Sequence, residues 1–344
     1  MLLNFALIMI SKEIYIKRWL YSGLIMVLLM MIIGGVTRIT GSGLSITTWS
    51  VSGEIPNIKN IESSYKLWKE SPQGQITPMT LEKYKFIYFW EYIHRMLGRI
   101  IGVIFIIPFI FFIIKKWITY EKIMRYIFLF ILGSIQAVIG WWMVKSGLIE
   151  KPEVSHFRLA IHFLSALFLL SYIWWMILSM NNNIKSNEKI YKLAKWFLLL
   201  LVIQLIFGAF TAGLKAGYLI DPQSKINTIF GYFNTSNHKN LDFLDNPYNV
   251  QLIHRSLAWI IICFSFYILK TSRGTHCYNI TRLLILIVSI QITLGIMTIT
   301  LNLHKHLAIT HQFFAIILTL ITVYLIHQSQ PKQKMKISDT SHPS

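Results

Sequence analysis

The sequence is poor in charged side chains and in cysteine. Only 14% of its 344 residues are charged and 54% are hydrophobic, whereas a water-soluble protein usually carries about 25% charged residues. This composition excludes an ordinary soluble protein and indicates a membrane protein. The two cysteines, Cys263 in an apolar run and Cys277 in a basic loop, exclude a disulfide framework and have no metal-ligand spacing.

Acidic residues are scarcer than basic ones, so the formal net charge is +19. A charge of this size can indicate a nucleic-acid partner. Here the basic residues fall in short loops between apolar runs, where the positive-inside bias places them. We therefore interpret the charge as a topology signal, and we expect membrane lipid and no nucleic acid as a partner.

Eight apolar runs are long enough to cross a membrane, because a spanning helix needs roughly 20 apolar residues. They cover residues 19–39, 92–114, 124–144, 156–178, 193–213, 250–269, 281–301 and 307–327. The loops after the second, fourth and sixth runs are basic, and the opposite loops are balanced. The sequence therefore predicts a multi-pass protein with both termini in the cytoplasm and with loops 40–90 and 214–249 outside.

The two long outer loops contain clusters of glycine, proline, asparagine and serine. The first of them also contains Trp49, Tyr65 and Trp68. Because a flexible linker has no need of large aromatic side chains, these loops favour ordered lids over linkers.

The order of short motifs in the first half returns in the second half. Gly34-Gly35-Val36-Thr37 resembles Gly208-Ala209-Phe210-Thr211, Ile93-His94-Arg95 matches Ile253-His254-Arg255, Ser134-Ile135-Gln136 with Gly140 matches Ser289-Ile290-Gln291 with Gly295, and Leu159-Ala160-Ile161-His162 matches Leu307-Ala308-Ile309 with His311 after a one-residue slip. Each half has an even number of helices, so both insert in the same direction. The predicted fold is an all-α membrane protein of eight transmembrane helices, arranged as two tandem four-helix bundles with pseudo-two-fold symmetry along the membrane normal.

The runs and the repeat also predict how the chain is divided. The predicted segments are a cytoplasmic N-terminal segment 1–18, an N-terminal four-helix half 19–178, a cytoplasmic linker 179–192, a C-terminal four-helix half 193–327 and a disordered cytoplasmic tail 328–344.

Four histidines lie within roughly the first two turns of the runs that start from the outer face: His94, His162, His254 and His311. Two neutral imidazoles from facing helices can hold a haem iron. A single membrane histidine can instead be an interhelical hydrogen-bond donor, but two pairs at matching depth favour metal or haem ligation. Of the other histidines, His156 and His304 lie nearer loop ends and look interfacial, and His306 could be confused with His311 by a slip in register.

Glu91 precedes His94 by three residues and shares its helix face. A carboxylate there suits a proton acceptor beside a cofactor, although an interfacial glutamate is also favoured by the helix dipole. Its replacement by Gln251 in the second half favours the catalytic role.

Arg95 and Arg255 lie at outer helix ends, where a guanidinium group can bind haem propionates or extend to lipid headgroups at the membrane surface. Arg38, Arg99 and Arg158 share this position.

These motifs together resemble those of the haem A synthase family. The matching stretches are Gly34-Gly35-Val36-Thr37-Arg38 with Gly41-Ser42-Gly43-Leu44-Ser45, Glu91-Tyr92-Ile93-His94-Arg95, Arg158-Leu159-Ala160-Ile161-His162 and Gln251-Leu252-Ile253-His254-Arg255. The likeness extends over residues 20–327. It implies a membrane oxidoreductase that oxidises a ring methyl group of haem O to a formyl group, through successive hydroxylations, and so makes haem A for cytochrome oxidase.

The resemblance also implies roles and partners. His94 and His162 would ligate the substrate haem O, His254 and His311 would ligate haem b as an electron carrier, and Glu91 matches the family's essential glutamate. The implied location is the bacterial inner membrane, with haem O synthase, the cytochrome oxidase assembly machinery and a membrane electron acceptor as partners. Because loops 40–90 and 214–249 lack cysteine, the chain resembles the cysteine-free branch typical of proteobacteria and mitochondria.

Two other functions stay open. A di-haem b-type membrane electron-transfer protein that does not modify haem would need the same histidine pairs. A transporter with internal repeats would need helices broken near the midplane, and the sequence offers only Pro108, in the second run, as a candidate kink.

Overall fold

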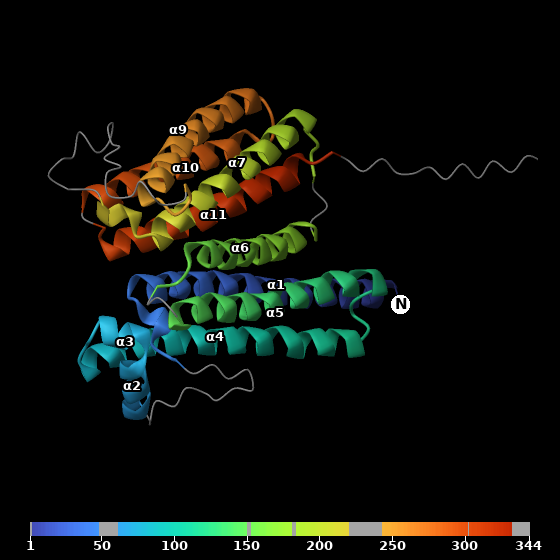
Figure 1. Cartoon of the computed structure of the whole chain (residues 1–344). Coiled ribbons are helices and arrows are strands. Elements are labelled where there is room, and N and C mark those ends of the chain that lie inside the picture. The colour runs from blue at the N-terminus through green and yellow to red at the C-terminus, as the bar shows by residue number, and fades with distance from the viewer. Residues whose placement is uncertain are drawn as a thin grey trace, which may run out of the picture.

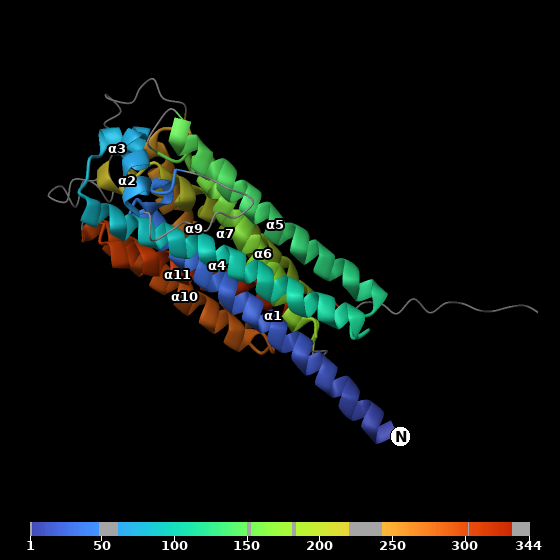
Figure 2. The same ribbon diagram turned by 90° about the horizontal axis from the view of Figure 1, so that it is seen from below.

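The computed structural model describes residues 2–47, 61–149, 153–180, 184–219, 243–301 and 303–331, and every regular element within these ranges is a helix. Eight of the described helices are long and apolar enough to cross a membrane. They are α1 (Leu2–Ile39), α4 (Leu81–Ile114), α5 (Tyr120–Ile149), α6 (His156–Leu178), α7 (Glu188–Gly213), α9 (Pro247–Ser272), α10 (Tyr278–Thr300) and α11 (Lys305–Ser329). They run side by side along the molecule (Figure 1 and Figure 2). The predicted all-α fold with eight spans is confirmed.

The helices extend beyond the apolar runs that predicted them. α1 begins inside the segment 1–18, α7 begins inside the linker 179–192, and α4 begins eleven residues before its run. Side chains of Thr80, Asn187 and Asn246 cap α4, α7 and α9 by accepting backbone hydrogen bonds from the first turn. The apolar pattern marks only the stretch that matches the hydrocarbon core, whereas a capped helix continues past it.

The helices pack in the same order in the two halves. In the first half α1 packs against α4 and α6, and α5 packs against α6 and more loosely against α4. In the second half α7 packs against α9 and α11, and α10 packs against the same two helices. The histidine-bearing helices of each half therefore face each other diagonally across a four-helix bundle. The pseudo-two-fold axis along the membrane normal stays a prediction.

Polar contacts join the two halves. Arg38 at the end of α1 donates a hydrogen bond to the carbonyl of Ala212 in α7, and Gln312 of α11 donates one to the carbonyl of Met31 at 2.9 Å. A Cβ added to Gly35 would lie only 2.8 Å from Oε1 of Gln312. Because apolar contact alone associates helices weakly in lipid, such hydrogen bonds and close approaches hold the halves together.

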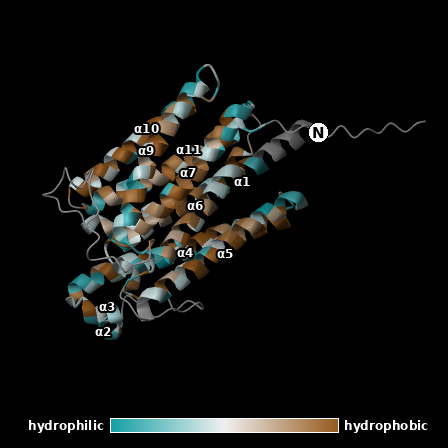
Figure 3. Ribbon diagram, turned by 45° about the horizontal axis from the view of Figure 1, so that its top comes forward, coloured by the Kyte–Doolittle hydropathy of each residue, from teal (hydrophilic) through white to brown (hydrophobic). Residues whose placement is uncertain are grey.

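The described part of loop 40–90 folds onto the end of α4. It contains η1 (Ser42–Leu44), α2 (Ile61–Glu70) and α3 (Pro72–Ile76). Trp68 and Tyr84 are fully buried here and pack with Ile46. This segment is a packed lid, as its aromatic residues predict, whereas Trp49 and most of loop 214–249 lie outside the described residues. Figure 3 shows that hydrophobic residues cover the length of the helices and that hydrophilic ones gather toward their ends.

Each of the eight described spans is one continuous helix, and α4 passes through Pro108 without a break. The described spans therefore lack the midplane interruption that a transporter of the expected kind requires. α11 ends at Ser329, and residues 332–344 of the predicted tail lie outside the described ranges.

We predict that Gly35→Ala will lower the stability of the folded protein. The new methyl group would displace the amide of Gln312 from the carbonyl of Met31, and loss of such a hydrogen bond costs about 0.5–1.5 kcal/mol. The measurement is the apparent Tm of the purified protein in detergent. Gly23→Ala on the same helix is the control, because a Cβ there meets nothing within 4 Å. Equal melting of the two variants would contradict the prediction.

Candidate functional site

His254 of α9 and His311 of α11 lie across the second bundle from each other. Their ring centroids are 6.5 Å apart, and the ring planes meet at 80°. An imidazole nitrogen binds a metal ion at roughly 2 Å, so two rings on opposite sides of one ion have centroids roughly 6 Å apart. The observed separation therefore fits two imidazoles that share one metal ion.

His94 of α4 and His162 of α6 occupy the corresponding places in the first bundle, each beside a glycine of the neighbouring helix. The Nδ1 atoms of His94, His162 and His311 are buried and make no hydrogen bond, while Nδ1 of His254 lies 3.3 Å from the carbonyl of Gln204. Buried polar atoms without partners are costly. These rings are therefore arranged for a ligand more than for interhelical hydrogen bonding.

Each of the four imidazoles rests on a glycine of a neighbouring helix. A Cβ added to Gly34, Gly140, Gly208 or Gly295 would lie 3.2, 3.2, 3.1 or 3.3 Å from Cε1 of His94, His162, His254 or His311, respectively. A larger residue would force the ring to shift, by a few tenths of an ångström for an added methyl group, and close-packed interiors transmit such shifts. These glycines stand in the repeated motifs, but the sequence alone does not show that each of them contacts a histidine.

The donor set fits a haem better than a bare metal ion. Among the residues that the structure describes, no group of three or more His, Cys, Asp or Glu side chains could hold a metal ion. Each histidine pair therefore suits an iron that brings its own in-plane ligands, as a haem iron does. The apolar interior of a four-helix bundle is a common place for such a group.

Glu91 lies in the first bundle, is only 3% exposed and is surrounded by donors. Its Oε2 accepts hydrogen bonds from the Ser45 amide (2.8 Å), the Ser45 hydroxyl (2.7 Å) and the Ile46 amide (2.8 Å). Its Oε1 accepts from Nη2 (2.6 Å) and Nε (3.1 Å) of Arg95. Hydrogen bonds that involve a charged group, such as those from Arg95, are among the stronger ones in proteins. The bonds to Glu91 also fasten the segment after η1 to α4, and we call this group of Ser45, Ile46, Glu91 and Arg95 the clasp.

The backbone before the clasp depends on one glycine. Gly41, between α1 and η1, has a φ of 71°, in the left-handed region that glycine adopts without strain. In the second half η3 (Ala216–Leu219) follows α7 in the same way. There Gln251 takes the place of Glu91, is equally buried at 3% exposure, and its Nε2 makes no hydrogen bond. The buried acid is therefore a feature of the first half.

Three of the arginines near the outer helix ends donate hydrogen bonds to groups of the protein itself. Arg95 binds Glu91 and also donates to the carbonyl of Ile46 at 2.9 Å. Arg99 and Arg158 donate to the backbone carbonyls of Arg95 and Trp142. The propionate-binding role of Arg95 and Arg255 stays a prediction.

The other histidines that the sequence singled out differ in how exposed they are. His304 and His306 are exposed at the start of α11, so His311 and not His306 faces His254. His156 differs from expectation, because it is only 8% exposed. It packs against Phe210 and lies 3.5 Å from Asp245. The sequence predicted an interfacial position for His156 and for His304, which the repeat aligns with it, but only His304 is exposed.

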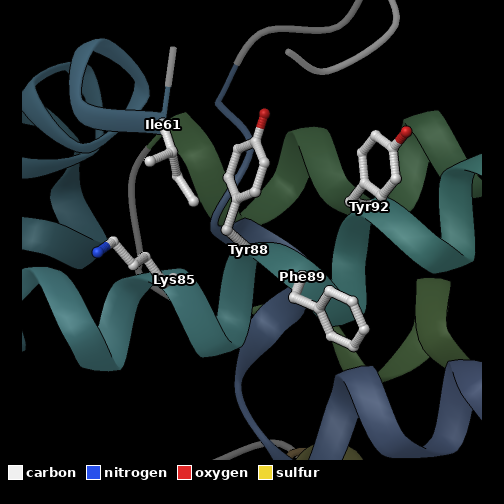
Figure 4. Close-up of a pocket in the computed structure, with 5 residues that line it drawn as sticks. All are labelled: Ile61, Lys85, Tyr88, Phe89 and Tyr92. Atoms are coloured by element: carbon white, nitrogen blue, oxygen red, sulfur yellow. The ribbon is translucent and has the colours of Figure 1, made fainter. Parts of the chain in front are cut away.

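A cavity of about 340 Å³ lies against α4, lined by Ile61, Lys85, Tyr88, Phe89 and Tyr92 (Figure 4). Tyr88 and Tyr92 are one turn apart, and both flank Glu91 in the sequence. None of the four imidazoles lines this cavity. It is therefore separate from the histidine pairs.

The cysteines offer no reactive thiol to the site. Cys263 is exposed on α9, and Cys277 is buried just before α10, at the opposite end of that helix from Gly295. Burial raises the pKa of Cys277 to about 11, so it stays a protonated thiol at neutral pH.

Comparison with known proteins supports the family resemblance that the motifs indicate. The model of the COX15-CtaA family, described as cytochrome oxidase assembly protein, matches residues 17–323. The chain belongs to this family. A protein named Heme A synthase from Flavobacterium psychrophilum is 37% identical over 90% of this chain and 96% of its own length. The Heme A synthases of Ehrlichia canis and Pelagibacter ubique are 38% and 37% identical, each over 91% of this chain and over 92% and 95% of their own lengths. The resemblance stated from the motifs is confirmed, because the family match spans both halves.

We predict that Glu91→Ala will open the clasp. Hydrogen bonds to a charged group contribute about 1.5–3 kcal/mol each, so amide exchange at Ser45 and Ile46 should accelerate at least about tenfold. Glu91→Gln keeps an acceptor oxygen and should accelerate it less. The measurement is hydrogen–deuterium exchange by mass spectrometry. The matched control is Glu82→Ala, which removes an exposed carboxylate from the same helix. Unchanged exchange in Glu91→Ala would show that the clasp does not hold this segment.

Proposed function

We propose that this protein is a membrane oxidoreductase that converts haem O to haem A for cytochrome oxidase. The single observation that carries the proposal is the pairing of four glycine-seated imidazoles with one buried carboxylate beside the first pair only. The membership of the chain in a cytochrome oxidase assembly family, with relatives named Heme A synthase, supports it.

The two histidine pairs hold different haems. His94 and His162 hold the substrate haem O between α4 and α6, and His254 and His311 hold a haem b between α9 and α11. When bound, haem b supplies one-electron transfer. Four apolar helices around each pair exclude water, and the glycine seats fix the ring orientations.

Glu91 acts as the proton acceptor. Oxidation of a methyl group to a formyl group, with the oxygen taken from water, releases four electrons and four protons. A positioned carboxylate can accept a proton from the reacting group, and hydrogen bonds from Arg95 and the loop amides orient Glu91. Gln251 cannot accept a proton in the same way, so chemistry is confined to the first half.

The proposed function also implies a location and partners for the protein. The protein spans the bacterial inner membrane with both termini in the cytoplasm and the lid of loop 40–90 outside. Haem O synthase supplies the substrate, a membrane electron acceptor removes the electrons, and the cytochrome oxidase assembly machinery receives the product.

One observation favours a second candidate, a di-haem b-type electron-transfer protein without haem modification. Every hydrogen bond described to the carboxylate of Glu91 belongs to the clasp, which is also what a purely structural glutamate would show. Haem extraction and mass analysis separate the two candidates. Only protohaem in the protein, even when haem O is supplied, would favour the electron carrier.

We predict that histidine substitutions will remove one haem at a time. His254→Ala or His311→Ala should lose haem b and keep haem O, whereas His94→Ala or His162→Ala should do the reverse. Loss of a ligand should weaken binding by more than the roughly 10–100-fold that loss of a ligand's hydrogen-bond partner costs. The measurement is the visible spectrum with extraction and mass analysis. The control is His306→Ala, an exposed histidine on α11. Loss of both haems from one substitution, or of neither, would contradict the assignment.

We predict that Glu91→Gln will stop haem A formation while haem O still binds. Loss of a positioned proton acceptor typically costs 10²–10⁴-fold in rate, so we expect a decrease of at least about 100-fold. The measurement is the haem A to haem O ratio extracted from cells supplied with haem O. Gln251→Ala is the matched control in the second half and should retain activity. Normal haem A output from Glu91→Gln would remove Glu91 from the mechanism.

A further inference from the structure

α4 and α5 pack against each other more loosely than the corresponding helices α9 and α10 do. Fewer of their apolar residues are buried inside the protein as well. Farther along α4 than His94, two ring contacts join α4 to α5: Phe105 with Phe130, and Phe109 with Tyr126. We call the boundary between α4 and α5, from these ring contacts to His94, the seam.

Three small residues on these helices correspond to larger ones in the second half. When His94 of α4 is aligned with His254 of α9, Gly102 corresponds to Ile262. When Gln136 of α5 is aligned with Gln291 of α10, Gly133 corresponds to Val288 and Ala137 to Ile292. Val288 is only 1% exposed, and Ile262 and Ile292 pack against the core. In the first half a Cβ on Gly102 or Gly133 would meet nothing within 4 Å, and Ala137 is exposed. The first half therefore has smaller residues at these three positions, on two helices that pack together more loosely than α9 and α10 do.

The open face leads to a histidine. Gly133 precedes Gly140 by seven residues, so both lie on one face of α5, about 10 Å apart. Gly140 is the seat of His162. An apolar path therefore runs along α5 from the histidine pair of the first half toward the middle of the membrane.

The other sides of the first bundle face protein. α6 packs against α7 and α11, and α1 packs against α11, so both helices are turned to the second half. A ring held between α4 and α6 with a long chain on its edge must release that chain between two helices. The seam is the side where the required space and contact with lipid coincide.

We propose that the seam is the exit through which the isoprenoid chain of haem O passes from the ring site into the lipid. This proposal rests on the proposed function, because it requires His94 and His162 to hold haem O. The chain is apolar and needs only an unobstructed passage, since lipid hydrocarbon and an apolar groove solvate it equally. The closed line between α9 and α10 correspondingly admits a haem without such a chain, which sorts the two haems between the halves.

The test fills the seam with the residues of the second half. Gly133→Val, Ala137→Ile and their combination are titrated with haem O and with protohaem, using full-length protein that already contains haem b. We expect haem O affinity to decrease at least about tenfold, because overpacking costs 1–3 kcal/mol. Binding of protohaem to the first half and the haem b content should stay within twofold of the starting protein. Gly23→Val, in open space on α1, is the control for replacing a helical glycine.

Three outcomes are decisive. Unchanged haem O affinity in the combined variant would overturn the proposal. An equal loss of haem O and protohaem would overturn it too, because the substitutions would then act on the ring site and not on the chain. If the unaltered protein takes up no haem O at all, the proposed function fails, and that result is visible before any variant is made. Ala137→Ile alone, a mild change at an exposed position, gives the answer if the combined variant does not fold.

Discussion

The close approach of an imidazole to a glycine is the contact on which the site depends. Helices in lipid gain little from apolar contact alone, so small residues that let groups approach closely decide how they pack. At four places a histidine ring lies so close to a glycine that a Cβ there would be only 3.1 to 3.3 Å from the Cε1 atom of the ring. In the second half, His254 and His311 lie across their bundle with ring centroids 6.5 Å apart. A side chain in place of either glycine would force the ring beside it to shift, and a shifted ring would fit a shared metal ion less well.

The same seat is built twice, but the surroundings differ. In the first half, Glu91 and Arg95 hold the segment after η1 against α4, so the acid, the lid and the helix that carries His94 form one unit. In the second half a neutral amide stands in place of that acid. A buried carboxylate is tolerated only with a full set of donors, and the backbone amides of Ser45 and Ile46 provide two of them. The lid is therefore part of what makes a charged group possible at this depth.

The sequence predicted the eight spans and the four histidines because both depend on local patterns, namely apolar runs and a motif that returns. It predicted helix ends poorly, since caps such as Thr80 extend α4 beyond the lipid-matched run. It could not predict the partners of Glu91, because the Ser45 amide is 46 residues away and a backbone donor leaves no mark in the sequence. The burial of His156 against Phe210 was missed because it depends on how α6 packs against α7. The repeated glycines were visible, but their contact with histidines on other helices depends on tertiary packing.

A duplicated unit that binds two similar macrocycles cannot tell them apart by its axial ligands. Both halves offer two imidazoles seated on glycine, so the iron meets the same environment in each. Discrimination must act at the edge of the ring, where the two haems differ. Near the histidines the first half has a buried acid where the second has an amide, and farther along the corresponding helices it has Gly133 where the second has Val288. Specificity often relies on a clash with the wrong partner as well as on contacts with the right one. Under the proposed function, the larger residues of the second half would then direct the substrate as much as the small residues of the first half.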